Sequence, residues 1–176
     1  MNILISERPN SLEIRQGRVS FEQAISQADI LSLHCPQTSE TTNLINAVVL
    51  EKMKPTAMLI NTARGALVSS VDLLAALKTK QIAYAVLDVL EQEPPPANHP
   101  LLVALTENNV DNLKVTAHIA WASSEAQQRL INLLADNIAA FKCGKKLNIL
   151  APSTAPFDCF ALRINGYAQD ERIRSG

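Results

Sequence analysis

The chain has 176 residues, of which 47% are hydrophobic, and this length and composition predict one globular domain with a substantial core. Its 16 basic and 17 acidic residues give a formal net charge of −1, and this balance argues against a nucleic-acid partner. No apolar run approaches the roughly 20 residues that span a bilayer, so we expect a cytoplasmic protein without a membrane partner.

Short apolar runs alternate with helical patterns along the chain, which is typical of a parallel β-sheet covered by helices. The near-continuous Ile, Leu and Val of these runs indicate burial on both faces of the sheet. The five predicted strands are Asn2–Ser6, Asp29–His34, Ala57–Asn61, Ala83–Asp88 and Leu113–Ala117. We therefore predict an α/β fold.

Three helices are predicted from capping-box-like starts, in which a serine is followed three residues later by an acceptor side chain. These starts are S-F-E-Q at Ser20, S-S-V-D at Ser69 and S-E-A-Q at Ser124. We expect the last helix to pack rather than to catalyse, because it keeps one apolar face and Gly144 is a natural stop. That face consists of Ala126, Leu130, Leu133, Leu134, Ile138 and Phe141.

Two stretches lack any helical or strand pattern. Residues 91–112 contain P-P-P and Pro100, which predict a long surface loop. Residues 151–176 have no periodicity that would bury a face, so we assign them to a poorly ordered tail. The three cysteines, Cys35, Cys143 and Cys159, are widely spaced and fit neither a disulfide framework nor a metal site.

Residues suited to reducing a 2-oxo acid follow three of the predicted strands: Arg64 in N-T-A-R-G, Glu93 in L-D-V-L-E-Q-E-P and His118 in V-T-A-H-I-A-W. An arginine can bind a carboxylate through two hydrogen bonds, and a histidine held by a carboxylate can pass a proton to a carbonyl oxygen. Each residue alone also has an ordinary interpretation: a surface arginine, a solvated loop charge or a structural histidine. Asp88, at the end of the strand that Glu93 follows, could equally be a helix cap or a loop carboxylate. Convergence of these strand ends at one sheet edge favours a functional site.

Four separated motifs closely resemble, in order and spacing, those of the D-isomer-specific 2-hydroxyacid dehydrogenases. They are D-I-L-S-L-H-C-P-Q-T-S-E-T-T-N-L-I-N, L-E-K-M-K-P-T-A-M-L-I-N-T-A-R-G-A-L-V, L-D-V-L-E-Q-E-P and T-A-H-I-A-W-A-S-S-E-A. The resemblance leans toward the glycerate dehydrogenase or hydroxypyruvate reductase branch. It implies that residues 1–150 form a partial NAD-binding domain with a Rossmann-like parallel sheet. The first strand and the glycine-rich turn of that fold would be lacking, since no G-x-G-x-x-G occurs in the chain.

The resemblance also implies roles for individual residues. Arg64 would bind the substrate carboxylate, His118 would be the acid and base, and Glu93 would hold the imidazole. Glu7 matches the acidic position that binds the adenosine ribose, which favours NAD, while Arg8 keeps NADP open. The remaining residues expected at the cofactor are Cys35, Pro36, Thr62 and Ala63, Asp88 near the nicotinamide carboxamide, and Arg64 and His118 themselves. The family's proline before the histidine is Ala117 here.

These observations support two hypotheses about function. The first is a fragment of an NAD-dependent oxidoreductase that reduces a 2-oxo acid such as hydroxypyruvate or glyoxylate. Full-length members would be homodimers, and this chain would need a complementing polypeptide to be active. The second is a non-catalytic remnant or interaction module that offers the apolar face of its last helix. Another nucleotide-binding α/β domain, such as a methyltransferase, would leave Arg64, Glu93 and His118 unexplained.

Overall fold

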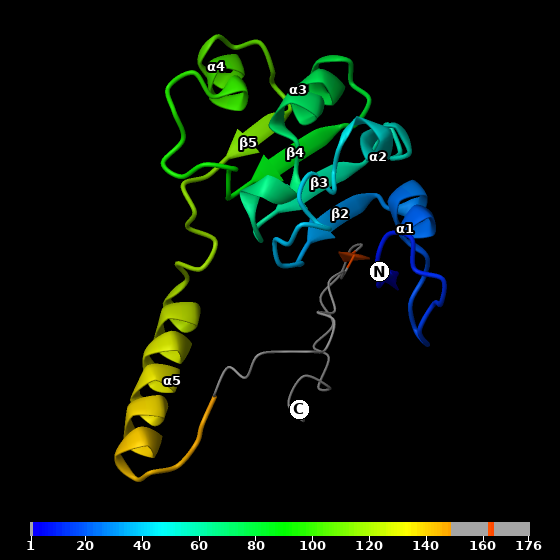
Figure 1. Cartoon of the computed structure of the whole chain (residues 1–176). Helices are drawn as coiled ribbons and strands as arrows, with labels where there is room; N and C mark the ends of the chain where they lie inside the picture. Colours follow the sequence, from blue (N-terminus) through cyan, green and yellow to red (C-terminus); the bar gives the residue numbers. More distant parts are fainter. Residues whose placement is uncertain (1, 149–161, 164–176) are drawn as a thin grey trace.

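The computed structural model describes residues 2–148 and 162–163 (Figure 1). Its strands are β1 (Ile3–Leu4), β2 (Ile30–Leu33), β3 (Met58–Asn61), β4 (Tyr84–Leu87), β5 (Leu113–Val115) and β6 (Leu162–Arg163). Its helices are α1 (Phe21–Gln27), α2 (Ala47–Glu51), the 3₁₀ turn η1 (Gly65–Leu67), α3 (Ser70–Lys78), α4 (Pro100–Thr106) and α5 (Ser124–Lys142). The predicted tail therefore lies outside the described residues, except for β6.

Four parallel strands form the main sheet in the order β2-β3-β4-β5. Helices α2, α3 and α4 lie side by side on one face of this sheet (Figure 1). The α/β prediction is confirmed, and the carboxyl ends of the strands share one edge, where ligands bind in open sheets of this kind.

One face of the sheet is buried more completely than the other. In β2, β3 and β4, fully buried residues alternate with partly buried ones. The strand register aligns the partly buried Ile30, Met58 and Tyr84 on the same face. The expectation of complete burial on both faces is therefore wrong, because α2, α3 and α4 all cover the same side.

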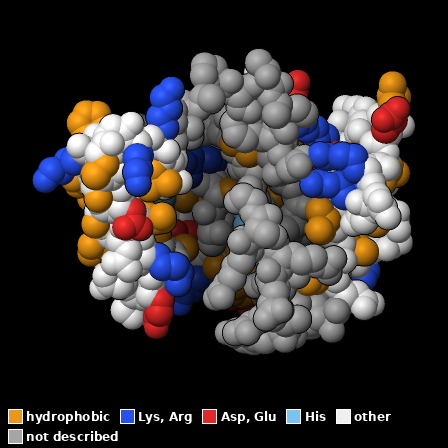
Figure 2. Space-filling view, turned by 90° about the horizontal axis from the view of Figure 1, so that it is seen from below, with side chains coloured by type: hydrophobic (Ala, Val, Ile, Leu, Met, Phe, Trp, Pro, Cys, Tyr) orange, Lys and Arg blue, Asp and Glu red, His pale blue; other side chains and the backbone are white. Residues whose placement is uncertain are grey.

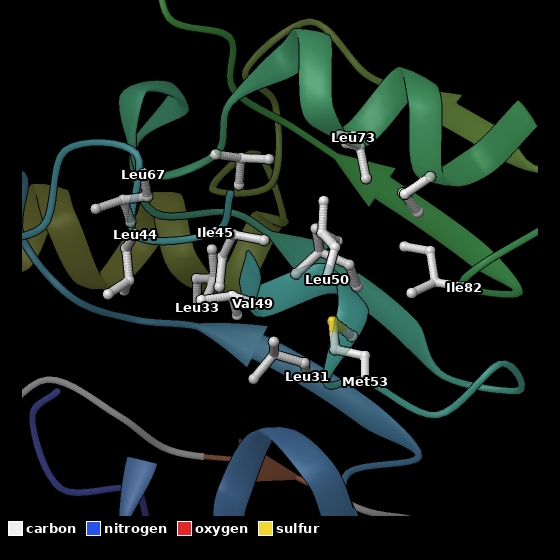
Figure 3. Packing of buried hydrophobic residues seen from close by; sticks show 14 of the residues in the cluster. Leu31, Leu33, Leu44, Ile45, Val49, Leu50, Met53, Leu67, Leu73 and Ile82 are labelled. Carbon is white, nitrogen blue, oxygen red and sulfur yellow. The ribbon is translucent and has the colours of Figure 1, made fainter. Parts of the chain in front are cut away.

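The core lies between β2–β4 and the helices on the covered face. Leu31 and Leu33 of β2 point toward Ile45 and Leu50 from the α2 region, and all four are fully buried (Figure 3). Burying each such side chain contributes about 1.5–3 kcal/mol relative to leaving it exposed. This packing makes the covered sheet a rigid support for the loops at its edge.

The first predicted strand lies outside the main sheet. It is reduced to the two residues of β1, which pair with β6 in a separate antiparallel sheet. Ser6 makes one further parallel bridge with Val19, and β6 lies beside β2. The segment thus keeps its extended backbone but lacks direct pairing with β2.

Serine caps begin three helices. Ser20 and Ser69 cap α1 and α3 as predicted, each accepting a backbone N–H three residues ahead. The cap of α5 is Ser123 rather than Ser124, since its hydroxyl accepts the Ala126 N–H at 3.2 Å. The helix ends at Lys142 with Cys143 as its C-cap, and Gly144 follows with a φ of +65°. The predicted starts and stop therefore hold to within one residue.

Two helices were not expected. Helix α4 interrupts the predicted loop of residues 91–112, with Pro100 at its first turn and Leu101 and Ala104 buried. Proline is favoured there because the first turn needs no intrahelical donor. Helix α2 is a five-residue helix capped by Asn46, whose side chain accepts the Val49 N–H. Both are short, so their apolar patterns were too brief to separate from loops.

Helix α5 extends away from the sheet and contains no buried residue (Figure 1). Its large apolar side chains are exposed, with Leu134 at 58% and Phe141 at 83%. Hydrophobic side chains gather on the left of Figure 2, where α5 lies. The expectation that this helix packs within the chain is wrong. Within the described residues, no helix is long and apolar enough to cross a membrane.

Candidate active site at the carboxyl edge of the sheet

His118 and Glu93 form a direct pair at this edge. Nδ1 of His118 lies 2.7 Å from Oε2 of Glu93, although the two residues are 25 positions apart. Oε1 of Glu93 accepts the backbone N–H of Leu90 at 3.0 Å. The Leu90 hydrogen bond and the His118 contact hold the pKa of Glu93 below its usual value. Because Nδ1 is engaged, Nε2 is the ring nitrogen left to meet a substrate.

The backbone of His118 adopts the left-handed conformation, with a φ of +53°. This conformation is uncommon for residues other than glycine and costs about 1–3 kcal/mol, so it persists only where the surroundings impose it. Two hydrogen bonds do so: the His118 N–H donates to the carbonyl of Asp88, and Nε1–H of Trp121 donates to the carbonyl of His118, both at 2.9 Å. The turn therefore aims the imidazole before any ligand binds.

Asp88 is buried beneath this turn. Its carboxylate accepts the hydroxyl of Thr116 and the backbone N–H groups of Ile119 and Ala120, the latter two at 2.9 Å. Burial alone would raise the pKa of Asp88, but these hydrogen bonds outweigh burial and lower it. The structure thus places Asp88 as an anchor for the turn, and contact with the nicotinamide stays a prediction.

Arg64 leaves the end of β3 on a turn that Asn61 builds. The fully buried Asn61 side chain donates to the Arg64 carbonyl at 2.8 Å and accepts the Ala63 N–H at 3.0 Å. The guanidinium itself is exposed, and its Nη1 donates to the Ala63 carbonyl at 2.7 Å. Among the described residues, no hydrogen bond joins Arg64 to Glu93 or His118.

Five of the eight residues expected at the cofactor line one hollow of about 610 Å³, whereas Glu7, Asp88 and His118 do not. It lies where β2 and β3 end, and it includes two residues that the sequence analysis did not select, His34 and Gln37. Nε2 of His34 lies 2.8 Å from the hydroxyl oxygen of Ser32. His34 and Gln37 flank Cys35 and Pro36 in the sequence, and this was the one feature that could have indicated their place in the hollow. The predicted residues in its lining are Cys35, Pro36, Thr62, Ala63 and Arg64.

A second hollow of about 480 Å³ opens beside the His118–Glu93 pair, with Asp88 also in its wall. Apolar side chains of α4 and β5, including Leu102 and Val115, form much of the remaining lining. The α4 part of this wall was not expected, because the α4 segment was predicted to be a loop.

Glu7 follows β1 and is buried in a cluster of arginines. Its carboxylate accepts Nη2 of Arg15 at 2.5 Å and Nε of Arg15 at 2.9 Å, as well as the backbone N–H of Arg8. The Arg15 hydrogen bonds are the main cause that lowers the pKa of Glu7 to about 2, against an opposing effect of burial. Both carboxylate oxygens are therefore engaged, and ribose binding by Glu7 stays a prediction.

The protein-family comparison matches residues 1–120 to "D-isomer specific 2-hydroxyacid dehydrogenase, NAD binding domain". The chain is 46% identical over 136 residues to a glycerate dehydrogenase of Methylorubrum extorquens, covering 77% of this chain and 42% of that protein. It is 49% identical over 125 residues to a glyoxylate reductase of Thermofilum pendens, covering 71% and 35%. The chain thus spans less than half the length of these curated relatives.

Among solved structures, the fold is similar to that of a D-lactate dehydrogenase with NAD⁺ from Lactobacillus jensenii. The TM-score is 0.68 at 28% sequence identity, and the match covers 84% of this chain and 47% of that one. A glyoxylate reductase from Paecilomyes thermophila matches with a TM-score of 0.63 at 32% identity, covering 74% and 38%. Sequence and structure therefore point to the same part of the same family.

Proposed function

The chain belongs to the D-isomer-specific 2-hydroxyacid dehydrogenase family through its NAD-binding domain, and we propose that it supplies the acid–base and carboxylate-binding residues for reversible reduction of a 2-oxo acid. The observation that carries this proposal is the 2.7 Å contact between His118 and Glu93 beside the strand end that bears Arg64. Hydroxypyruvate and glyoxylate are the substrates we propose, because relatives named for both compounds match the chain.

Each residue has a distinct part in the proposed reaction. Arg64, whose guanidinium is exposed, would bind the substrate carboxylate through parallel hydrogen bonds. Glu93 would hold the ring of His118 through Nδ1, so that Nε2–H of the imidazolium can donate a proton to the substrate carbonyl oxygen. Bound NADH would supply the hydride. In the oxidation direction, His118 takes the proton back.

The hollow at the ends of β2 and β3 is the place proposed for the nicotinamide half of NAD. Its lining comes from strand ends of a parallel sheet, the usual place for such a ligand. Cys35, Pro36, Thr62 and Ala63 would line the nicotinamide, and Arg64 would face both cofactor and substrate. Glu7 would reach the adenosine ribose by exchanging a hydrogen bond now made by Arg15. NAD is the cofactor we propose on this basis.

A complementing polypeptide is part of the proposal. Glu93 and His118 are both substantially exposed, with side-chain exposures of 35% and 49%, so water reaches the pair. Water weakens the electrostatic interactions on which proton donation depends. We therefore propose that the chain alone has little activity and that a polypeptide covering the unmatched part of the relatives would close the site.

A second candidate function is that of an interaction module. The exposed apolar face of α5 favours it, because isolated helices with such a face gain stability by burying it. Here the chain would bind a partner through α5 without catalysing a reaction. The partner could be the complementing polypeptide or a second copy of the chain, as in a homodimer.

Binding and turnover can be tested separately. Trp121 is the only tryptophan, and its indole donates to the His118 carbonyl, so its fluorescence reports on the site. NADH is titrated into the folded chain, and hydroxypyruvate reduction is then measured for the chain alone and for a complemented assembly. We define this assembly as the chain mixed with a polypeptide covering the unmatched part of a relative. Saturable quenching of the fluorescence, together with turnover in the assembly, supports the oxidoreductase function. An assembly that forms but shows no turnover supports the interaction module.

A further inference from the structure

Gly65 packs directly against a neighbouring peptide group. A Cβ atom at this position would lie 1.9 Å from the carbonyl carbon of Leu90, 2.0 Å from its oxygen and 2.4 Å from the backbone nitrogen of Glu91. The φ of Gly65 is not in the left-handed region, so its conformation alone does not call for glycine. The close approach of the two backbones does.

The Leu90–Glu91 peptide is itself held in place. Oε1 of Glu91 accepts the backbone N–H of Ser70 at 3.0 Å, at the start of α3, and Oε2 lies 3.0 Å from Nε2 of the buried His99. Burial would raise the pKa of Glu91, but these two hydrogen bonds outweigh burial and lower it. An added methyl group at position 65 therefore meets a backbone that cannot withdraw without breaking these contacts.

This contact joins the two halves of the candidate site. On one side, Arg64 directly precedes Gly65. On the other, the N–H of Leu90 donates to Glu93 at 3.0 Å, and Glu93 contacts His118 at 2.7 Å. Within the described residues, Gly65 and Leu90 thus connect an arginine and an imidazole that share no hydrogen bond.

We propose that Gly65 is a positioning residue, whose backbone contact with Leu90 and Glu91 fixes the separation between Arg64 and the Glu93–His118 pair. The inference rests on the proposed function, because the separation matters for a molecule that presents a carboxylate to Arg64 and an adjacent carbonyl to His118. A 2-oxo acid has these two groups on neighbouring carbons. A shift of about 1 Å in such a geometry can reduce turnover on the order of a hundredfold.

The first test uses the full chain and needs no turnover. In Gly65→Ala, the displaced Leu90 N–H no longer reaches Glu93, so the pKa of Glu93 rises toward its usual value. The measurement is a pH titration of the Glu93 carboxyl carbon by NMR in the ¹³C-labelled protein, with circular dichroism to confirm folding. Gly17→Ala is the matched control: it adds the same methyl group with nothing within 4 Å, at a strained φ of +80°. General destabilisation would change the Glu93 titration in both variants, whereas a positional effect would change it in Gly65→Ala alone.

A second variant covers the case in which Gly65→Ala does not fold. Glu91→Ala adds no atoms but frees the Leu90–Glu91 peptide from Ser70 and His99, and it should also raise the pKa of Glu93. An unchanged Glu93 titration in a folded variant of either kind overturns the inference. Absence of turnover in the complemented assembly would instead count against the proposed function, and the titration would still report whether Gly65 positions Glu93.

If the complemented assembly turns over, kinetics provide a further check. Gly65→Ala should lower kcat/KM for hydroxypyruvate about a hundredfold, while the affinity for NADH in the fluorescence titration stays close to that of the unmodified chain. An equal loss in Gly17→Ala, or kcat/KM unchanged in Gly65→Ala, would count against a positioning role.

Discussion

The backbone N–H of His118 donates to the backbone carbonyl of Asp88 at 2.9 Å, which ties the candidate proton donor to the end of β4. The Asp88 carboxylate extends this tie by binding the two N–H groups that follow His118. Asp88 thereby joins the end of β4 to the turn that carries His118. The orientation of the imidazole therefore depends on a carboxylate that lies beneath it.

Asp88→Asn should destabilise the protein by about 1.5–3 kcal/mol, because the new amide nitrogen cannot accept the N–H of Ala120 and leaves it unpaired. Urea unfolding followed by circular dichroism measures the change. Thr116→Val removes the hydroxyl donor to the same carboxylate and should have a smaller effect. A loss in Thr116→Val as large as in Asp88→Asn would show that the backbone donors are not the dominant partners.

His118→Gln should lower kcat in the complemented assembly by about 10²–10⁴-fold, because general acid–base catalysis contributes a factor of this size. Glutamine keeps a side chain of similar polarity but cannot be protonated at neutral pH. The NADH titration serves as the control, since cofactor affinity should change little. A variant that retains full kcat would remove His118 from the proposed mechanism.

Arg64→Lys should raise KM for hydroxypyruvate more than it lowers kcat. Lysine keeps the positive charge but loses the planar pair of donors that binds a carboxylate at two points. The comparison is with Arg64→Ala, in which both charge and donors are lost and kcat/KM should fall further. Equal kinetics for the unmodified chain and both variants would show that Arg64 does not contact the substrate.

Glu7 should make the stability of the fold depend on pH. Its pKa is about 2 in the folded protein against an ordinary value of 4.5, so folding favours the ionised form. The stabilisation is fully present above pH 4.5 and is lost as the pH falls toward 2. The measurement is the free energy of unfolding between pH 2 and pH 6 for the unmodified chain and for Glu7→Gln. The difference between them should shrink on acidification; a difference that is constant with pH would contradict the assignment.

Substitutions on α5 should leave the stability of the chain nearly unchanged. Leu134→Gln alters a side chain that is not buried, so the free energy of unfolding should change by about 0.5 kcal/mol or less. Leu59→Ala, in the fully buried part of β3, should instead lose about 2–5 kcal/mol. If α5 is the docking surface of a partner, Leu134→Gln should weaken assembly with the complementing polypeptide in a pull-down or by analytical ultracentrifugation. If Leu134→Gln and the unmodified chain bind the complementing polypeptide equally well, α5 is not the docking surface.

The sequence predicted the elements whose signals are local. Four of the five predicted strands form the main sheet, and the serine caps located the helix starts to within one residue. The meeting of Glu93 with His118 followed from a general property of parallel sheets, that strand ends share an edge. These features depend on neighbouring residues or on topology, and both can be read from a single chain.

Features that depend on unrelated segments could not be predicted. Nothing around Glu7 indicates that Arg15 returns to bind it, and Gly65 does not reveal that Leu90 lies against it. The apolar face of α5 was recognised, but a pattern of apolar residues says only that a face is suited to burial. Whether that face is covered depends on what else is present, and in this chain α5 remains exposed.

The left-handed backbone of His118 lowers the local stability of the turn, whereas the proposed proton transfer requires a histidine at this position. Glycine adopts this conformation more readily than histidine, while an exposed contact such as that with Glu93 contributes about 1 kcal/mol at most. His118→Gly would therefore relax the turn and at the same time abolish the proposed proton transfer. A selection for thermal stability alone would drift away from histidine at this position, whereas a selection that includes turnover would retain it.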